Sequence, residues 1–300
     1  MGLKIVRGDG ELIGVLAGSL IARILFQPLE ESSRLYFSRQ LSSPTPSLQS
    51  LTLSSSLLSL LLLLQSHLFL IFSLLLPSYT TPALYHLLGS RWSSTSAPRI
   101  LGWYVGGYLP LMGVNGISEA FFQSAAEGEW MKKGARWWGV CSAVFVGLCA
   151  AEYWRSSAGG FLGSSADEFL GNTAGREAGG GLGEVQLILI NCVGMIMRIV
   201  FSFKFINSYF STKLALLSLP PPSITLSSPS SPSTKSEIAA INNRLRPSNL
   251  LPKWPTILVF GISSYIVRRS EKENDWMTLG GLMRHGGVGV GVGITGLGIM

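Results

Sequence analysis

Four polar residues lie within or just after the first apolar stretch of the chain, and their spacing brings them together. Arg23 lies inside the otherwise apolar residues 12–26. Three polar residues follow it at i+4, i+7 and i+11: Gln27, Glu30 and Arg34. On a helix this spacing places all four on one stripe. An arginine at the centre of a bilayer costs about 2.5–3.5 kcal/mol, so such a residue usually binds an anion or forms an ion pair.

Two further groups of polar residues interrupt later apolar stretches. Pro110 frees a backbone carbonyl, and Asn115 and Glu119 follow it at i and i+4 on one helix face. Asn191 and Arg198 share a face of a later apolar segment at i and i+7. A broken helix with a carboxylate is typical of transporter sites near the bilayer midplane, and an arginine can bind a phosphate through two hydrogen bonds.

Each group also has a structural interpretation. Arg23 could extend to lipid headgroups, with Glu30 and Glu31 capping the end of the first helix in water. Glu119 could lie at a helix end and meet water, and Arg198 could form an ion pair with Glu119 or Glu30. No nucleotide-binding loop, serine-hydrolase elbow or zinc-protease motif occurs, so the sequence predicts neither catalysis nor a cofactor or metal.

The composition indicates an integral membrane protein. Charged residues make up 13% of the 300 residues, about half of the roughly 25% usual in soluble proteins. The net charge of +7 lies mostly in the connectors between apolar stretches. There it favours anionic lipid headgroups, and we expect no nucleic-acid partner. The three cysteines lie in apolar segments without metal-ligand spacing and are expected to be small buried residues.

Six or seven segments are apolar enough to span or partly span a bilayer. They are residues 12–26, 51–76, 100–126, 137–154, 185–206, 254–267 and 286–300. We therefore predict an all-α polytopic membrane protein with one helical domain over residues 1–300. Flexible connectors are expected near residues 155–183, which are rich in glycine, and 211–253, which contain a Pro/Ser tract. The Lys and Arg residues divide equally between the two sides and do not orient the chain.

Three stretches resemble, in the same order, characteristic stretches of the eukaryotic oligosaccharide translocation proteins. They are Ala22–Ser32, Asn115–Phe121 and Asn191–Ile199. These relatives are endoplasmic-reticulum membrane proteins tied to flipping the dolichol-linked oligosaccharide used in N-glycosylation. The resemblance implies a fold of the multidrug/oligosaccharidyl-lipid/polysaccharide exporter type, with two helical bundles around a central cavity. It begins near Gly14 and corresponds to the C-terminal part of the family, so a truncated protein is expected.

The resemblance also implies a function without bond-making chemistry. The protein would help to translocate the dolichol-diphosphate-linked oligosaccharide across the endoplasmic reticulum membrane, with this glycolipid and membrane lipids as its partners. Arg23 and Arg198 would stabilise the diphosphate in an inward-facing cavity. The other candidate residues would bind sugar hydroxyls or position the arginines: Gln27, Glu30, Glu31, Asn115, Glu119 and Asn191.

Two alternative functions remain open at this point. One is a cation-coupled exporter of small molecules with the same fold, in which Glu119 or Glu30 binds the proton. The other is a non-transporting membrane helper that scaffolds glycosylation enzymes. The glycolipid interpretation requires that Arg23, Glu119 and Arg198 lie sheltered among the helices and face one another.

Overall fold

The computed structural model describes residues 2–41, 43, 46–158, 183–218, 232–273 and 278–298. Within these ranges every secondary-structure element is helical. In chain order the elements are α1 (Gly2–Leu41), α2 (Leu48–Leu74), η1 (Leu76–Tyr79), α3 (Thr80–Leu88), α4 (Ser90–Ser93), α5 (Ala97–Trp103), η2 (Tyr104–Tyr108), α6 (Leu109–Ala125), α7 (Glu129–Ala158), α8 (Gly183–Ser218), α9 (Pro232–Arg244), α10 (Pro247–Leu250), α11 (Trp254–Glu273) and α12 (Leu279–Gly298).

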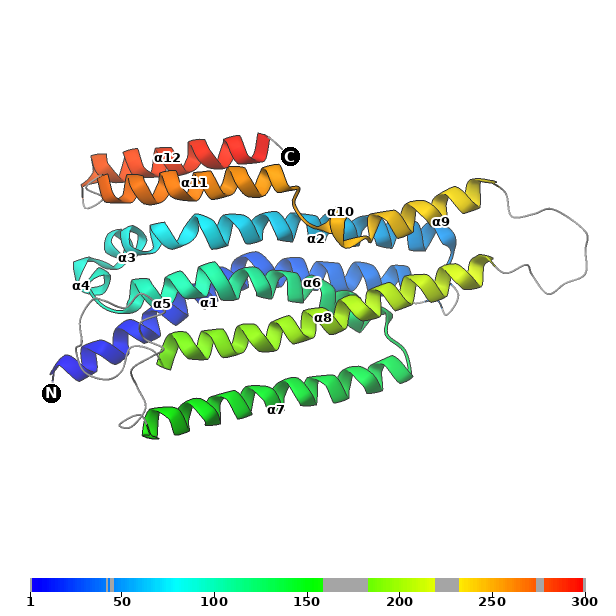
Figure 1. Cartoon of the computed structure of the whole chain (residues 1–300), viewed down its shortest axis with the longest axis horizontal. Coiled ribbons are helices and arrows are strands. Elements are labelled where there is room, and N and C mark those ends of the chain that lie inside the picture. Colours follow the sequence, from blue (N-terminus) through cyan, green and yellow to red (C-terminus); the bar gives the residue numbers. More distant parts are fainter. Residues whose placement is uncertain are drawn as a thin grey trace, which may run out of the picture.

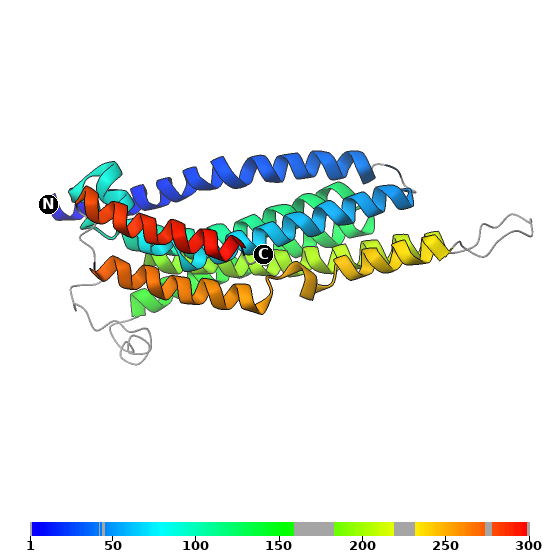
Figure 2. The ribbon, with the colours of Figure 1, turned by 90° about the horizontal axis from the view of Figure 1, so that it is seen from above.

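The long helices lie side by side along one axis, and α6 is the central one (Figure 1). α6 packs against α1, α2 and α8. Helix α7 flanks α8 at one edge of the bundle, and the pair α11 and α12 lies at the opposite edge (Figures 1 and 2). The central position of α6 decides which polar side chains are enclosed, because three helices cover it.

An aromatic core fixes α6 within this bundle. Phe121 is fully buried, and its ring lies 5.1 Å from that of Phe37 on α1 and 5.5 Å from that of Phe210 on α8. Phe122 is also buried and packs edge-on against Phe205 at 4.9 Å. Large rings in such offset or edge-to-face contacts contribute both buried area and preferred geometry. The core therefore sets the rotation of α6 relative to α1 and α8.

Helix α1 continues through Pro28, which corrects one expectation. Glu30 and Glu31 do not cap a helix end, because α1 runs on to Leu41. Pro28 cannot donate a hydrogen bond to the carbonyl four residues earlier, but one missing bond is tolerated where neighbouring helices hold the chain. α1 packs along α6, and its buried Phe37 lies in the aromatic core beyond the proline.

The expected segment 100–126 is a helical run with a wider turn inside it. The π-helical turn η2 joins α5 to α6, and Pro110 lies in the first turn of α6. In an α-helix, a proline at 110 leaves the carbonyl of Gly106 without its usual donor. Ser73 of α2 donates its hydroxyl to that carbonyl oxygen at 2.7 Å. The carbonyl expected to be freed by Pro110 is thus bonded by a neighbouring helix.

Three helices in the described part of the chain are long and apolar enough to cross a membrane. They are Leu48–Leu74, Glu129–Trp154 and Val185–Leu217. Serine and threonine hydroxyls within α2 donate hydrogen bonds to backbone carbonyls of the same helix. Thr52 Oγ1, for example, donates to the carbonyl oxygen of Leu48 at 2.9 Å. The expected segment 100–126 is divided at η2, so neither α5 nor α6 is long enough by itself to count as a candidate span. The total of six or seven segments stays a prediction.

Only parts of the two expected connectors lie within the residues that the structure describes. Residues 159–182 and 219–231 lie outside the described ranges. Of the rest, residues 211–218 continue α8, and 232–250 contain α9 and α10. The side chain of Ile241 is fully buried in the aromatic core, which explains why this polar segment is helical.

Candidate functional site

Three side chains form a hydrogen-bonded stripe on α6, here called the polar stripe of α6: Asn115, Glu119 and Gln123. Asn115 Nδ2 donates to Glu119 Oε2 at 2.9 Å, and Gln123 Nε2 donates to Glu119 Oε1 at 3.4 Å. Asn115 is buried, Glu119 is half-buried and Gln123 is exposed. The i, i+4, i+8 spacing of one helix face therefore fixes a carboxylate between two amides.

The polar stripe continues onto α1. Arg34 Nη1 donates to Gln123 Oε1 at 3.2 Å, and the same guanidinium forms an ion pair with Glu31. Ser124 Oγ donates to the backbone carbonyl of Arg34 at 3.0 Å. These bonds join two helices that are far apart in sequence, so the two helices hold one network.

A second carboxylate lies next to this network. Glu30 of α1 lies over Gly116, where an added Cβ atom would be 2.9 Å from Glu30 Oε2. Glu30 follows the apolar residues 12–26 and is half-buried. Burial raises the pKa of the Glu30 carboxyl, and the nearby charge of Glu119 raises it further. The two carboxylates therefore offer acceptors to a ligand that donates hydrogen bonds.

Arg198 lies on α8, close to residues of two other elements. Its side chain interacts with the thiol of Cys141 on α7 and with Tyr108 of η2. Trp137 Nε1 donates to the backbone carbonyl of Met197 at 3.0 Å, which ties α7 to α8 beside the arginine. Arg198 is half-buried, and within the described residues its buried Nε has no hydrogen-bond acceptor.

The arginine and the carboxylates are near one another but not bonded. Glu119 and Arg198 both act electrostatically on the Cys141 thiol. Among the described side chains, however, Arg198 forms no ion pair with Glu119 or Glu30, so the structure does not show the ion pair that was one of its two possible roles. Arg198 on α8 therefore provides a cationic donor that can bind an anion of a ligand. The carboxylates on α1 and α6 provide acceptors for hydroxyl groups of a ligand.

The remaining candidate residues lie outside this network. Asn191 is half-buried on α8, and Arg23 and Gln27 are exposed on α1. The shelter expected for Arg23 is thus absent, while Glu119 and Arg198 are half-buried as expected. Arg23 forms no hydrogen bond or ion pair within the part of the chain that the structure describes.

Two contributors to the site are missing from the sequence-based set. Gln123 continues the i+4 spacing from Glu119, and this regular spacing could have revealed it. Cys141 reaches Arg198 only through the packing of α7 on α8, for which no sequence signal exists. In the described ranges no group of three or more His, Cys, Asp or Glu side chains could hold a metal ion, and the three cysteines are free.

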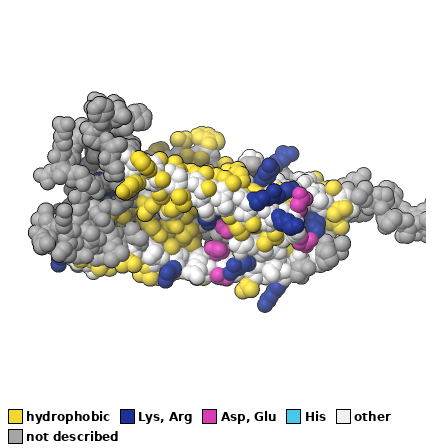
Figure 3. All heavy atoms as spheres, turned by 90° about the horizontal axis from the view of Figure 1, so that it is seen from below, with side chains coloured by type: hydrophobic (Ala, Val, Ile, Leu, Met, Phe, Trp, Pro, Cys, Tyr) yellow, Lys and Arg dark blue, Asp and Glu magenta, His cyan; other side chains and the backbone are white. Residues whose placement is uncertain are grey.

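The face of the bundle seen from the α7 edge is typical of a membrane protein. Apolar side chains cover much of it, while Lys, Arg, Asp and Glu side chains gather toward one end (Figure 3). Exposed apolar residues of α7 and α8 include Val146 and Val200. Together with the three apolar helices and the partly buried polar network, this face defines a helical membrane protein with a polar site between its helices.

The family follows from sequence comparison. The family model described as Rft-1, Rft protein, matches residues 15–164, which are half of the chain. The chain therefore belongs to the Rft protein family. The matched residues include the first two of the three stretches on which the resemblance was based, with Glu30 and the polar stripe of α6.

Several yeast proteins, each named Man(5)GlcNAc(2)-PP-dolichol translocation protein RFT1, are similar to this chain. The Saccharomyces cerevisiae protein is 32% identical over 192 residues, which cover 64% of this chain and 29% of that protein. The Schizosaccharomyces pombe protein is 32% identical over 205 residues, covering 68% and 34%. The Kluyveromyces lactis protein is 41% identical over 112 residues, covering 37% and 20%. The chain thus spans about a third or less of these relatives, and no solved structure matches it.

Proposed function

We propose that this chain is part of an endoplasmic-reticulum membrane protein that translocates Man(5)GlcNAc(2)-PP-dolichol for N-glycosylation. Family membership and the names of the relatives support this substrate. The helices would form part of an exporter-type bundle and cross the membrane several times. No covalent bond of the substrate changes, so the function requires neither a catalytic residue nor a cofactor.

The observation that carries the proposal is the buried, unbonded Nε of Arg198. A buried donor without an acceptor destabilises the protein, and a charged one does so more strongly. A phosphate oxygen is a suitable acceptor, because a guanidinium binds it through parallel, charge-assisted hydrogen bonds. A diphosphate must pass an apolar layer about 30 Å thick, and such a cation between apolar helices lowers the cost.

The polar stripe of α6 supplies the complementary groups for the sugar. Glu119 and the amides of Asn115 and Gln123 present acceptors and donors in a row, and Glu30 adds a second carboxylate beside them. Sugar hydroxyls both donate and accept, so they suit a mixed row of amides and carboxylates. Glu31 would position Arg34 at the end of this row. The remaining candidates would extend the surface along α1 and α8: Arg23, Gln27 and Asn191.

Binding of the glycolipid by the purified chain tests the proposal. We expect the chain to retain Man(5)GlcNAc(2)-PP-dolichol in detergent, and Arg198→Gln to weaken this binding about tenfold by removing one charge-assisted contact. Arg136→Gln, at an exposed arginine of α7, is the matched control and should bind as the unmodified chain does. Equal binding by the Arg198→Gln variant would exclude the arginine from the substrate site.

Growth and glycosylation of yeast separate the alternative functions. The test uses a Saccharomyces cerevisiae strain depleted of its own RFT1 protein. This strain is supplied with a chimaera in which the present chain replaces the matching region of that protein. Arg23→Ala and Arg198→Ala should then lower glycan occupancy at equal expression. Normal occupancy with both substitutions would favour a scaffolding helper, and a pH-gradient-dependent export abolished by Glu119→Gln would favour a cation-coupled exporter.

A further inference from the structure

A groove runs along α2 on the side where α9 and α10 pack against it (Figure 1). Its volume is about 570 Å³, within the range of roughly 300–1,000 Å³ usual for small-molecule sites. It follows α2 from Leu53 to Leu63, which is about 15 Å of helix, and Tyr36 of α1 lines it as well. None of its described lining residues belongs to α6 or α8, so the groove is distinct from the site proposed above for the glycolipid.

One charged residue lines the groove within the described part of the chain, and it is Arg244 at the end of α9. The fully buried Ile241 lies one turn earlier and holds this end of α9 on the core, so Arg244 is half-buried. Among the described residues, the buried Nη1 of Arg244 has no hydrogen-bond partner, and no carboxylate forms an ion pair with this arginine. A guanidinium in this state favours an anion, and phosphate matches its paired N–H groups.

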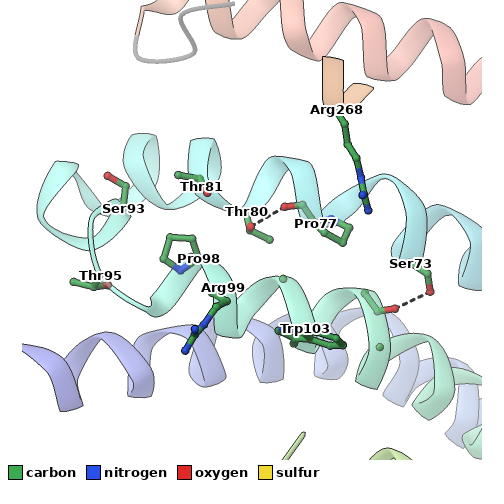
Figure 4. Close-up of a pocket in the computed structure, with 13 residues that line it drawn as sticks. Ser73, Pro77, Thr80, Thr81, Ser93, Thr95, Pro98, Arg99, Trp103 and Arg268 are labelled. Atoms are coloured by element: carbon green, nitrogen blue, oxygen red, sulfur yellow. Dashed lines mark hydrogen bonds between the residues drawn. The ribbon is translucent and has the colours of Figure 1, made fainter. Parts of the chain in front are cut away.

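The larger cavity of the bundle, at the end of α2 that carries Ser73, is less suited to an anion. Its two arginines, Arg99 and Arg268, lie on opposite sides of it and do not point toward each other (Figure 4). Arg99 also has an interaction with another residue already. The two cations therefore do not converge on one anion, in contrast to the single unpaired guanidinium in the groove.

Neutral polar groups lie on the same walls as Arg244. Asn249 Nδ2 donates to the backbone carbonyl of Asn243 at 2.6 Å, which leaves Asn249 Oδ1 as an acceptor. Ser59 Oγ donates to the backbone carbonyl of Ser56 at 2.9 Å, and its oxygen keeps a lone pair for another donor. No described lining residue is acidic, so the groove suits headgroup hydroxyls better than an ammonium group.

The remaining walls of the groove are apolar and open toward the outside of the bundle. Leu53 and Leu60 are exposed, while Leu57 and Leu63 are half-buried between them and α9 or α1. All four belong to α2, one of the three candidate spans, so lipid acyl chains would contact them in a bilayer. Basic pockets between membrane helices bind anionic headgroups, and here a row of leucines continues from such a pocket.

We propose that this groove binds an anionic phospholipid with a hydroxyl-bearing headgroup, for which phosphatidylinositol is the probe. Arg244 binds the phosphate, and the oxygens of Asn249 and Ser59 accept hydrogen bonds from the headgroup hydroxyls. One acyl chain lies along Leu57 and Leu60. This lipid site is additional to the proposed glycolipid site and does not depend on it.

Native mass spectrometry of the full chain in detergent, with phosphatidylinositol added, tests the role of the cation. The unmodified chain should retain one phosphatidylinositol in preference to phosphatidylcholine. Arg244→Gln should lower this retention about tenfold, because the charge-assisted contact to the phosphate is lost. Arg246→Gln is the matched control, since Arg246 is exposed two residues further on and does not line the groove. Equal retention by Arg244→Gln and Arg246→Gln would overturn the proposal.

A second pair of variants tests the apolar wall and leaves the core intact. Leu60 is 62% exposed, and Leu60→Trp should fill the groove and lower retention of phosphatidylinositol about fivefold by displacing the acyl chain. Leu64→Trp places the same ring one turn later on α2, outside the groove, and should bind normally. Unchanged retention by Leu60→Trp contradicts the proposal even if Arg244→Gln does not fold.

Competition distinguishes the sources of the phosphate. Water-soluble inositol phosphate at the same concentration should not displace the lipid, because it has no acyl chain for the leucines. Complete displacement would assign the groove to a soluble ligand and overturn the proposal. Displacement by Man(5)GlcNAc(2)-PP-dolichol would overturn it as well, by making the groove part of the glycolipid site.

Discussion

Gly116 leaves the space that the carboxylate of Glu30 occupies. A Cβ atom at this position would lie 2.9 Å from Glu30 Oε2 and 3.4 Å from Glu30 Cδ. Because the carboxylate is the free end of a flexible side chain, it can move without separating α1 from α6. Gly116→Ala should therefore displace Glu30 and weaken glycolipid binding about fivefold, the loss of about one hydrogen bond, without lowering thermal stability.

Gly139→Ala is the control for the effect of alanine on a helix. Gly139 is exposed on α7, and a Cβ atom there would meet no heavy atom within 4 Å. Both substitutions should stabilise their helices by about 0.5–1 kcal/mol, since glycine is the weaker helix former. Only Gly116→Ala should change glycolipid binding, and unchanged binding in this variant would exclude Glu30 from the site.

The residue pairs that could be predicted are those within one helix. The i, i+4 spacing predicted that Asn115 and Glu119 share a face, and the hydrogen bond between them confirms it. The neighbours of Arg198 could not be predicted, since Cys141 approaches it from another helix. Contacts of this kind depend on the rotation of each helix, which the aromatic core determines through packing.

At the scale of elements, the position of α6 depends on Phe121. Its fully buried ring contacts Phe37, Phe205, Tyr209 and Phe210 from α1 and α8. Phe121→Ala removes these contacts and leaves a cavity, so we expect a loss of about 3–5 kcal/mol in the free energy of unfolding. A large fall in the thermal unfolding temperature of the detergent-solubilised protein would show it.

Tyr153→Ala provides the matched control for truncating a ring. Tyr153 is 72% exposed on α7, so its removal creates no internal cavity. The free energy of unfolding of this variant should stay within about 0.5 kcal/mol of that of the unmodified protein, as for most surface substitutions, and its unfolding temperature should hardly change. Equal effects of the two truncations would mean that the aromatic core does not hold α6.

Apolar stretches predicted the main helices, while local composition misled at two places. A proline followed by two glutamates reads as a helix end, yet α1 continues because α6 packs along it. The Ser- and Pro-rich residues before Arg244 read as a connector, yet part of them forms α9 because Ile238 and Ile241 pack on the core. In both cases tertiary packing outweighs local propensity.

At the scale of the whole molecule, the directions of the helices constrain how the chain crosses a membrane. Helices α2 and α7 both begin at one end of the bundle and end at the other, and α8 runs in the opposite direction (Figure 1). If α2 and α7 cross in the same direction, the chain between them must return across the bilayer. The helical run from Ala97 to Ala125 is about 40 Å long, which exceeds the apolar thickness of about 30 Å.

Single cysteines at exposed positions test this arrangement after the three native cysteines are replaced by alanine. Gln49 lies in the first turn of α2, and Glu127 lies just before α7. Ser90 lies between these two helices in the sequence. In sealed vesicles, an impermeant maleimide should either label the cysteines at both 49 and 127 and not the one at 90, or label only the one at 90. Equal labelling after permeabilisation shows that all three are accessible. Equal reactivity at 49 and 90 would mean that α2 does not cross, and different reactivity at 49 and 127 would mean that residues 97–125 do not return the chain.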